Sequence, residues 1–370
     1  MKKISLIVSI IVFSILTAAI VIILYTSAPQ TSGTEDRGAF KVGLIFNGAC
    51  SDRNWGQSHY DALVRLSDEL DLELVCRENV PADESCLDTI KELAEDELCA
   101  MVVLTSFEYG DFIEKAAETY PDVYFLNAAG TKYGANYASF FGRMYQLRYL
   151  SGILAGMQTK TNNIGYIAAF PIPEVIRGIN AFTLGVRSVN PDAEVHVSFC
   201  DSWSDDEKAR YSAELLSDSF QADIIAVHTD SLSPYETAAQ RGIMSIGSNY
   251  DNSDIYPGSF LSSCVWEWDG YYKEQILSAK QGKFHGEYRW FGIESGLMRL
   301  SDLAPSVDED TINAVNSAYD KLMSRNFDVF YGPITDSDGI QRVAAGESMS
   351  DESMLYSFDW YVEGVHVVGE

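Results

Sequence analysis

Short apolar or β-branched runs alternate with amphipathic stretches along most of the chain. In the first half this pattern predicts strands at 41–47, 72–77, 100–104 and 123–127, and helices at 55–70, 86–97 and 111–119. Strands that alternate with helices of this length indicate βαβ units around a parallel sheet.

The same cycle starts again near residue 163. It predicts strands at 163–168, 194–199, 223–227 and 243–247, and helices at 174–188, 205–219 and about 234–241. Apolar residues of the predicted helix 174–188 recur at helical spacing and therefore share one face. They are Val175, Ile179, Phe182 and Val186. Further along, the sequence predicts a helix at about 268–281, a strand pair within about 288–300 and a helix near 308–324.

These elements predict an α/β fold of two doubly wound parallel-sheet lobes. Because no Pro-rich or Gly/Ser-rich linker separates the halves, we expect a hinge at which the chain crosses several times. The expected division is 1–28 as leader or anchor, 29–40 as linker, 41–158 with about 266–283 as lobe 1, and 159–265 with about 284–370 as lobe 2.

The N-terminus predicts a membrane segment. Two lysines precede residues 4–25, which carry no charge. This stretch is longer than the ~7–15 apolar residues of a secretory signal and can span a bilayer. We expect an uncleaved anchor, with cleavage near Ala28 as the alternative. In both cases the lysines stay inside and the rest of the chain lies outside the cytoplasm.

Composition narrows the functional classes. The 370 residues include 26 Lys and Arg against 54 Asp and Glu, a formal net charge of −28, and 46% are hydrophobic. Such a chain can bury a large core, and its acidic balance excludes nucleic acid as a partner. None of the six cysteines forms a CxxC motif. Two states of these cysteines are possible: a disulfide among Cys76, Cys86 and Cys99, or buried free thiols.

Motifs for catalysis or metal binding are missing from the sequence. It lacks HExxH, GxSxG, GxGxxG and a GKS or GKT phosphate loop, and its five histidines have no ligand spacing. The acidic runs lack the order of a calcium loop. We therefore expect no catalytic residues, no metal and no cofactor, and we interpret His228 as a satisfied polar residue at a strand end.

Aromatic, amide and acidic side chains recur after the predicted strands of both lobes. Ligands of open parallel sheets bind at this edge. Aromatic faces suit a flat heterocycle, and an aspartate accepts hydrogen bonds from ring N–H, amino or hydroxyl groups. Trp55 can instead be core, and Asp230 can instead cap the next helix. The candidate ligand contacts are Asn47, Trp55, Ser106, Phe107, Asn127, Phe170, Trp203, Asp230 and Asp251.

Residues 145–190 closely resemble the BMP family of ABC-transporter substrate-binding proteins. The similarity continues through 201–205, 228–231, 246–247, 265–268, 332–334 and 359–365, and so covers the chain from Lys41 onward. The resemblance implies a type I periplasmic-binding-protein fold that closes on a purine nucleoside or base and delivers it to an ABC permease. Relatives are usually lipoproteins, whereas this chain would be held by residues 4–25.

The resemblance also implies roles for single residues. It places Trp55 and Trp203 on the two faces of the base and Asp251 near the ribose. Trp266, a tenth candidate contact, stands where relatives often have a lysine near the ribose, and 228–231 replaces a Gly-rich segment. Both departures favour a free base such as adenine, with Asp230 as acceptor. The alternatives are a ligand-sensing ectodomain and, with less support from the residues, a nucleoside hydrolase.

Overall fold

The computed structural model describes residues 39–368. Residues 41–368 belong to one compact unit, to which the description below applies. The predicted anchor at 4–25 and the cleavage position near Ala28 lie outside the described residues. Among residues 39–368, no helix has both the length and the apolar character needed to cross a bilayer.

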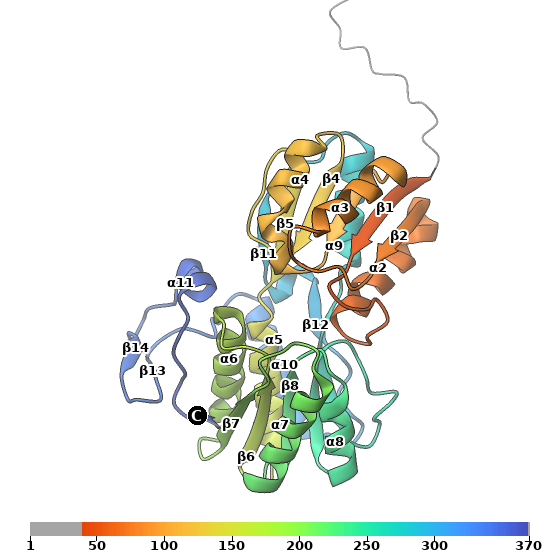
Figure 1. The fold of residues 1–370 in the computed structure, drawn as a ribbon. Coiled ribbons are helices and arrows are strands. Elements are labelled where there is room, and N and C mark those ends of the chain that lie inside the picture. Colours follow the sequence, from red (N-terminus) through yellow and green to blue (C-terminus); the bar gives the residue numbers. More distant parts are fainter. Residues whose placement is uncertain (1–38, 369–370) are drawn as a thin grey trace, which may run out of the picture. The chain divides into compact units, whose positions relative to one another are not determined.

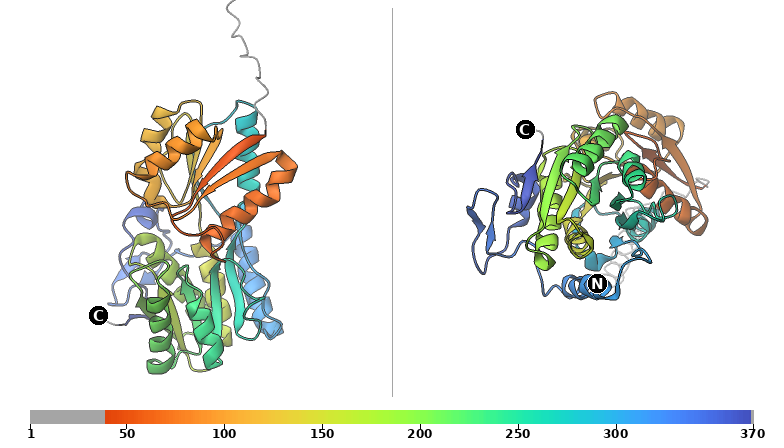
Figure 2. Two further views of the ribbon diagram at one scale, coloured as in Figure 1. Left: turned by 45° about the vertical axis from the view of Figure 1, so that its right-hand side comes forward. Right: turned by 90° about the horizontal axis from the view of Figure 1, so that it is seen from below.

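The first lobe is built on a six-stranded sheet of the described residues, in the order β11-β5-β4-β3-β1-β2, whose strands lie side by side in Figure 2. The strands are β1 (Phe40–Ile45), β2 (Leu72–Arg77), β3 (Met101–Leu104), β4 (Tyr124–Ala128), β5 (Tyr137–Gly142) and β11 (Tyr288–Phe291). The helices are α2 (Trp55–Leu70), α3 (Cys86–Lys91), α4 (Ile113–Thr119) and α9 (Asp269–Lys280), with a π-helical turn η1 (Glu92–Asp96) and a 3-10 turn η2 (Phe107–Asp111).

The second lobe has a seven-stranded sheet within the described chain, in the order β12-β10-β9-β8-β6-β7-β15. The strands are β6 (Asn163–Ala168), β7 (Glu194–Phe199), β8 (Ile224–His228), β9 (Met244–Asn249), β10 (Phe260–Trp266), β12 (Met298–Leu300) and β15 (Val365–Val367). The helices are α5 (Tyr145–Gln158), α6 (Pro173–Val189), α7 (Asp206–Ser219), α8 (Ser233–Arg241) and α10 (Glu309–Met323), with a 3-10 turn η3 (Ile293–Ser295).

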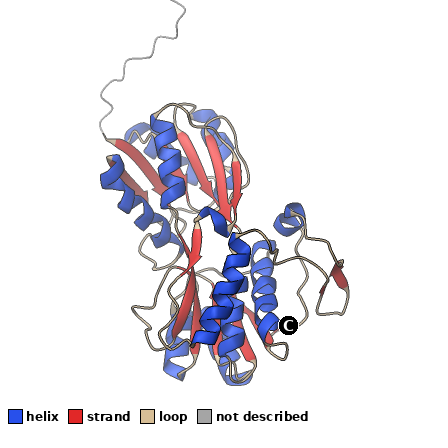
Figure 3. Ribbon diagram, turned by 180° about the vertical axis from the view of Figure 1, so that it is seen from behind, coloured by secondary structure: helices blue, strands red, loops and turns tan. Residues whose placement is uncertain are grey.

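Helices cover both faces of the second sheet. Figure 1 shows α7 and α8 in front of it, and Figure 3 shows further helices on the opposite side. Central strands β3 and β8 are buried at every residue, as expected for parallel strands covered on both faces. In the second sheet, over the residues that the structure describes, only β12 runs antiparallel to its neighbour. The predicted fold of two α/β lobes with parallel sheets is confirmed.

Within the described residues the chain passes between the lobes three times: from β5 to α5, from β10 to α9 and from β11 to β12. Two segments differ from the expected division. Helix α5, expected in lobe 1, packs on α6, β10 and β12 of the second lobe. Strand β11, expected in lobe 2, pairs with β5 in the first lobe, so β11 and β12 do not form the predicted strand pair.

Close backbone packing explains the position of α5. A Cβ atom on Gly152 would lie 2.0 Å from the carbonyl oxygen of Phe182, and one on Gly185 would lie 2.0 Å from that of Tyr149. Glycines at the contact let α5 and α6 approach more closely than side chains would allow. This contact holds α5 in the second lobe.

Beyond α10 the chain forms the hairpin of β13 (Ile334–Thr335) and β14 (Gln341–Val343), followed by α11 (Asp351–Tyr356). In Figures 1 and 2 this hairpin stands off from the second sheet. Each of the six cysteines is a free thiol in the described chain, and Cys86 and Cys99 are buried in the first lobe's core. The structure thus agrees with the buried-thiol alternative for this pair.

Candidate functional site

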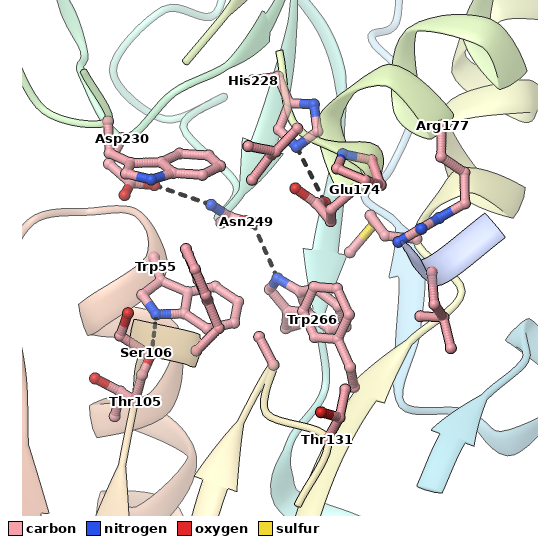
Figure 4. A pocket seen from close by; sticks show the side chains of 18 of the residues that line it. Trp55, Thr105, Ser106, Thr131, Glu174, Arg177, His228, Asp230, Asn249 and Trp266 are labelled. Atoms are coloured by element: carbon pink, nitrogen blue, oxygen red, sulfur yellow. Dashed lines mark hydrogen bonds and ion pairs between the residues drawn. The ribbon is translucent and has the colours of Figure 1, made fainter. Parts of the chain in front are cut away.

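A cavity of about 390 Å³ lies between the carboxyl ends of strands from both lobes. Its size falls in the range of small-molecule sites, ~300–1,000 Å³. The first lobe contributes Asn47, Trp55, Thr105, Ser106, Phe107, Ala129, Thr131 and Phe141. The second lobe and the hinge contribute Met144, Arg148, Ile172, Pro173, Glu174, Arg177, Trp203, His228, Asp230, Asn249, Trp266 and Tyr288 (Figure 4 shows part of this lining). Tyr288 belongs to β11, which pairs in the first sheet next to the hinge.

Trp55 is placed by the turn that begins α2. The carboxylate of Asp52 accepts the backbone N–H groups of Asn54, Gly56 and Gln57 at 2.8–2.9 Å, so it caps the helix. A Cβ atom on Gly56 would lie 2.2 Å from the carbonyl oxygen of Ala49, so this tight turn requires glycine. The indole of Trp55, the first helical residue, then donates to the carbonyl oxygen of Thr105.

Trp55 belongs to an aromatic cluster with Trp266 and Trp268. The rings of Trp266 and Trp268 are stacked, with centroids 4.3 Å apart and planes at 13°. Trp55 meets both rings edge-on, with its centroid 5.7 Å from each. Trp266 comes from β10 of the second lobe and is 5% exposed. The cluster therefore joins the two lobes at the cavity wall, and Trp55 both packs against aromatic neighbours and lines the cavity.

Trp203 lines the same cavity from the second lobe. It follows β7 and is half-buried, and its ring lies edge-on to Phe170 with centroids 6.0 Å apart. Its carbonyl oxygen accepts the backbone N–H of Asp230 at 2.7 Å. This bond ties the Trp203 loop to the loop after β8.

Asp230 and Asn249 form the centre of a hydrogen-bond network. Asn249 Nδ2 donates to Asp230 Oδ1 at 3.1 Å and, across the cleft, to Asn54 Oδ1 at 2.9 Å. Asn249 Oδ1 accepts from the indole of Trp266 at 2.9 Å (Figure 4). Asn249 has a φ of +63°, in the left-handed region that asparagine tolerates. Its amide thereby links the two lobes to the acid that faces the cavity.

The Asp230 carboxyl has a pKa raised to about 8. Burial is the main cause, the charges of Asp52 and Glu174 add to it, and the hydrogen bond from Asn249 opposes it. Asp230 does not cap α8 in the described structure. Its carboxyl faces Asn249, while Ser231 Oγ accepts the N–H of the first residue of that helix.

Charged side chains gather at the other end of the cavity. Glu174 Oε1 lies 3.4 Å from His228 Nε2, and His228 Nδ1 lies 3.0 Å from the hydroxyl of Tyr166. Burial acts to raise the pKa of Glu174, but the histidine and two nearby arginines outweigh it and lower the pKa. Burial and the Arg148 charge lower the pKa of His228. The lowered pKa leaves Glu174 ionised at pH 7. In Figure 4, Glu174 and Arg177 lie on the side away from Asp230 and Trp55.

Direct contacts between the lobes border the cavity. Arg53 Nε donates to Asn252 Oδ1 at 3.0 Å, and Arg53 Nη2 contacts Asp254 at 2.5 Å. The hydroxyl of Tyr250 donates to Asp61 at 2.8 Å. These contacts join the first turns of α2 to the loop after β9 and hold the lobes together at the cleft.

Comparison with known proteins places this architecture in a family. Residues 39–330 match the family model described as ABC transporter substrate-binding protein PnrA-like. A purine-binding protein of Brucella abortus is 33% identical over 327 residues, 88% of this chain and 92% of that protein. The chain belongs to the PnrA-like family of ABC-transporter substrate-binding proteins. The predicted resemblance to the BMP family is confirmed.

Other relatives of this substrate-binding protein differ in the ligand that their names give. A Haloferax volcanii protein, named as a glucose-binding component of an ABC transporter, is 32% identical over 351 residues, 92% of this chain and 86% of that protein. A solved solute-binding protein from Aeropyrum pernix shares the fold, with a TM-score of 0.68, 17% identity, and coverage of 85% of this chain and 95% of that one. The matched family is one of solute-binding proteins rather than enzymes.

Seven of the ten predicted contact residues line the cavity of this substrate-binding protein. They are Asn47, Trp55, Ser106, Phe107, Trp203, Asp230 and Trp266. Contact with a ligand stays a prediction for each of them.

Three predicted residues lie outside the cavity lining. Asn127 is fully buried, and its amide donates to the carbonyl oxygens of Leu104 and Ser106, so it joins strand ends. Phe170 packs on the ring of Trp203. The Asp251 carboxylate accepts the backbone N–H of Ser253 at 2.9 Å and so stabilises a turn. Placement after a strand brought these side chains near the cavity but not into its wall.

The lining also contains residues that the sequence did not single out. Glu174 follows the turn after β6, and Asn249 is the last residue of β9. The rule that ligand contacts follow the carboxyl ends of parallel strands (the strand-end rule) would have found both if it had been applied more widely. Arg148 and Arg177 lie within α5 and α6, and no local signal in the sequence marks them. Among the described residues, no group of three or more His, Cys, Asp or Glu side chains is arranged to hold a metal ion.

Proposed function

We propose that this substrate-binding protein binds a purine base or nucleoside in the cavity between its lobes and delivers it to an ABC permease. Trp55 and Trp203 line the cavity from opposite lobes. By analogy with nucleic-acid binding, each stack of a base on an aromatic ring contributes about 1–3 kcal/mol. Two such faces support a flat ring as the ligand.

The observation that carries the proposal is that the Asp230 carboxyl lines the same cavity as the indoles of Trp55 and Trp203. With a pKa of about 8, this group is largely protonated at neutral pH and offers one donor and one acceptor. The edges of purine bases present an N–H group beside a ring nitrogen or carbonyl acceptor, so a protonated carboxyl is complementary to them. A hexose can also pair with this carboxyl through its hydroxyl groups, but it lacks the flat aromatic face that stacks on the indoles of Trp55 and Trp203. The cavity therefore favours a purine over the glucose in the name of the Haloferax relative.

Calorimetry with adenine, hypoxanthine, adenosine, inosine and glucose tests this proposal. We expect saturable binding of purines, with the ligand recovered unchanged, and no heat with glucose. Trp203→Ala should weaken purine binding roughly 5- to 150-fold, which corresponds to the loss of one stack. Trp203→Phe keeps an aromatic face and should retain most of the affinity. Binding of glucose without binding of purines would refute the proposed ligand.

Delivery to a permease follows from the family, whose members act outside the cytoplasm. We propose that residues 4–25 hold this protein at the membrane next to its permease. Fractionation of cells that express the full chain checks this: we expect the protein in the membrane fraction, and release to the soluble fraction would show cleavage near Ala28 instead.

A further inference from the structure

Helix α11 returns to the cavity from the C-terminal part of the chain. Its last two residues, Leu355 and Tyr356, line the cavity. The helix lies beyond residues 39–330, which the family model matches. We propose that α11 is an end wall of the binding cavity and that Tyr356 contacts a substituent carried by the bound ring, so that α11 determines how large a ligand is accepted. The chemical class of the ring rests on the proposed function.

The position of α11 is fixed from two sides. Both terminal nitrogens of Arg143, at the start of the hinge, donate to the carboxylate of Asp351. The guanidinium of Arg143 also lies over the ring of Trp290, 4.0 Å from its centroid. A terminal nitrogen of Arg177, in α6, donates to the carbonyl oxygen of Met354. The helix is thus tied to the hinge and to the second lobe, rather than resting on the surface.

Two side chains in the second half of α11, Met354 and Tyr356, have different roles. Met354 is 2% exposed and anchors the helix, whereas Tyr356 is 62% exposed although it lines the cavity. Its ring therefore has surface that a ligand can cover. Because Arg177 contacts α11 directly, Tyr356 belongs to the end of the cavity that holds Glu174.

This end is polar, unlike the aromatic end. An ionised Glu174 accepts hydrogen bonds from hydroxyl groups, and the guanidinium of Arg177 donates them. Asp230 and Trp55 lie on the opposite side in Figure 4. A ring held at the aromatic end reaches α11 only through an attached group, and the chemistry there fits a hydroxylated one. A bare ring would not extend to Tyr356.

The test compares a small and an extended ligand of the same class in calorimetry on the full chain. The pairs are adenine with adenosine, and glucose with maltose. Tyr356→Ala should lower the affinity for the extended ligand about fivefold or more and leave that for the small ligand within about twofold. Asp351→Asn weakens the ion pair with Arg143 and should also lower the affinity for the extended ligand relative to that for the small ligand. Tyr331→Ala is the control, since Tyr331 is 55% exposed on the same segment and is not part of the lining.

The outcomes separate this inference from the proposed function. If wild type binds purines and Tyr356→Ala leaves the adenosine-to-adenine ratio unchanged, α11 is not a specificity wall, while purine binding stands. If wild type binds sugars and not purines, the proposed ligand is wrong, and the maltose-to-glucose ratio decides the role of α11 by the same criterion. Equal weakening of the small and extended ligands by Tyr356→Ala would also overturn it.

Discussion

Replacing Asp230 by asparagine should stabilise the ligand-free protein at alkaline pH. The folded state holds a proton on this carboxyl up to a pKa of about 8, whereas the unfolded chain releases it near 3.9. Between these values the folded state binds more protons than the unfolded state, so this group makes stability fall as pH rises. The full difference has an upper limit of about 6 kcal/mol. Because the carboxyl is partly exposed, solvent screening reduces the expected effect to about 1–3 kcal/mol.

Urea unfolding of wild type and Asp230→Asn at pH 4.5 and pH 8.5 measures this effect. The variant carries no proton to lose, so its stability relative to wild type should rise by about 1–3 kcal/mol between the two pH values. Asp251→Asn is the matched control, because that carboxylate stabilises a turn outside the cavity. An equal pH-dependent difference for this control would show that the effect is not specific to Asp230. A flat or falling difference for Asp230→Asn would refute the assignment of a protonated acid at this position in the folded protein.

Two further predictions concern the scaffold. Gly152→Ala should lower the free energy of unfolding by about 1–3 kcal/mol in urea, because the added Cβ would lie 2.0 Å from the carbonyl oxygen of Phe182. The control is Gly270→Ala in α9, which should be neutral or stabilising because nothing lies within 4 Å of the added Cβ. Equal effects of the two substitutions would contradict the packing argument. Arg53→Ala removes contacts with the second lobe, so the ligand-free protein should show a larger radius of gyration in small-angle scattering. Arg65→Ala is the control: it breaks an ion pair within the first lobe and should leave the radius of gyration unchanged.

Much of the fold follows from local pattern. The predicted helix at 55–70 and the predicted strands at 72–77, 163–168 and 194–199 have the boundaries seen in α2, β2, β6 and β7. At the boundaries of these elements the spacing of apolar residues changes, and polar or turn-forming residues mark the ends of each helix or strand. The predicted helix at 86–97 is present, but its last turn is the π-helical η1, which periodicity does not distinguish.

Three elements that the sequence did not predict show no regular spacing of buried and exposed residues. Two of them are buried on nearly all sides, and the third is too short. Helix α5 is buried over most of its length and has glycines at its contact with α6, so it lacks an amphipathic period. Strand β10 is buried at all seven residues and shows no alternation. Helix α11 has six residues, which is too short for periodicity to identify. The strand-end rule found the aromatic end of the cavity, while the charged end depends on Arg148 and Arg177, which tertiary packing brings there.

Arg148 shows how the hinge is connected to the cavity. It lies in α5, which begins three residues after β5 ends, and it is 1% exposed. Its guanidinium donates to the carbonyl oxygen of Val227 at 2.9 Å and to the hydroxyl of Ser248 at 2.7 Å, so it fixes the ends of β8 and β9 from which Asp230 and Asn249 follow. The second lobe's polar face is therefore rigidly joined to the hinge helix, whereas Trp55 is fixed to the first lobe. Movement at the hinge then changes the distance between two preformed faces, and a ligand that contacts both faces stabilises the closed arrangement.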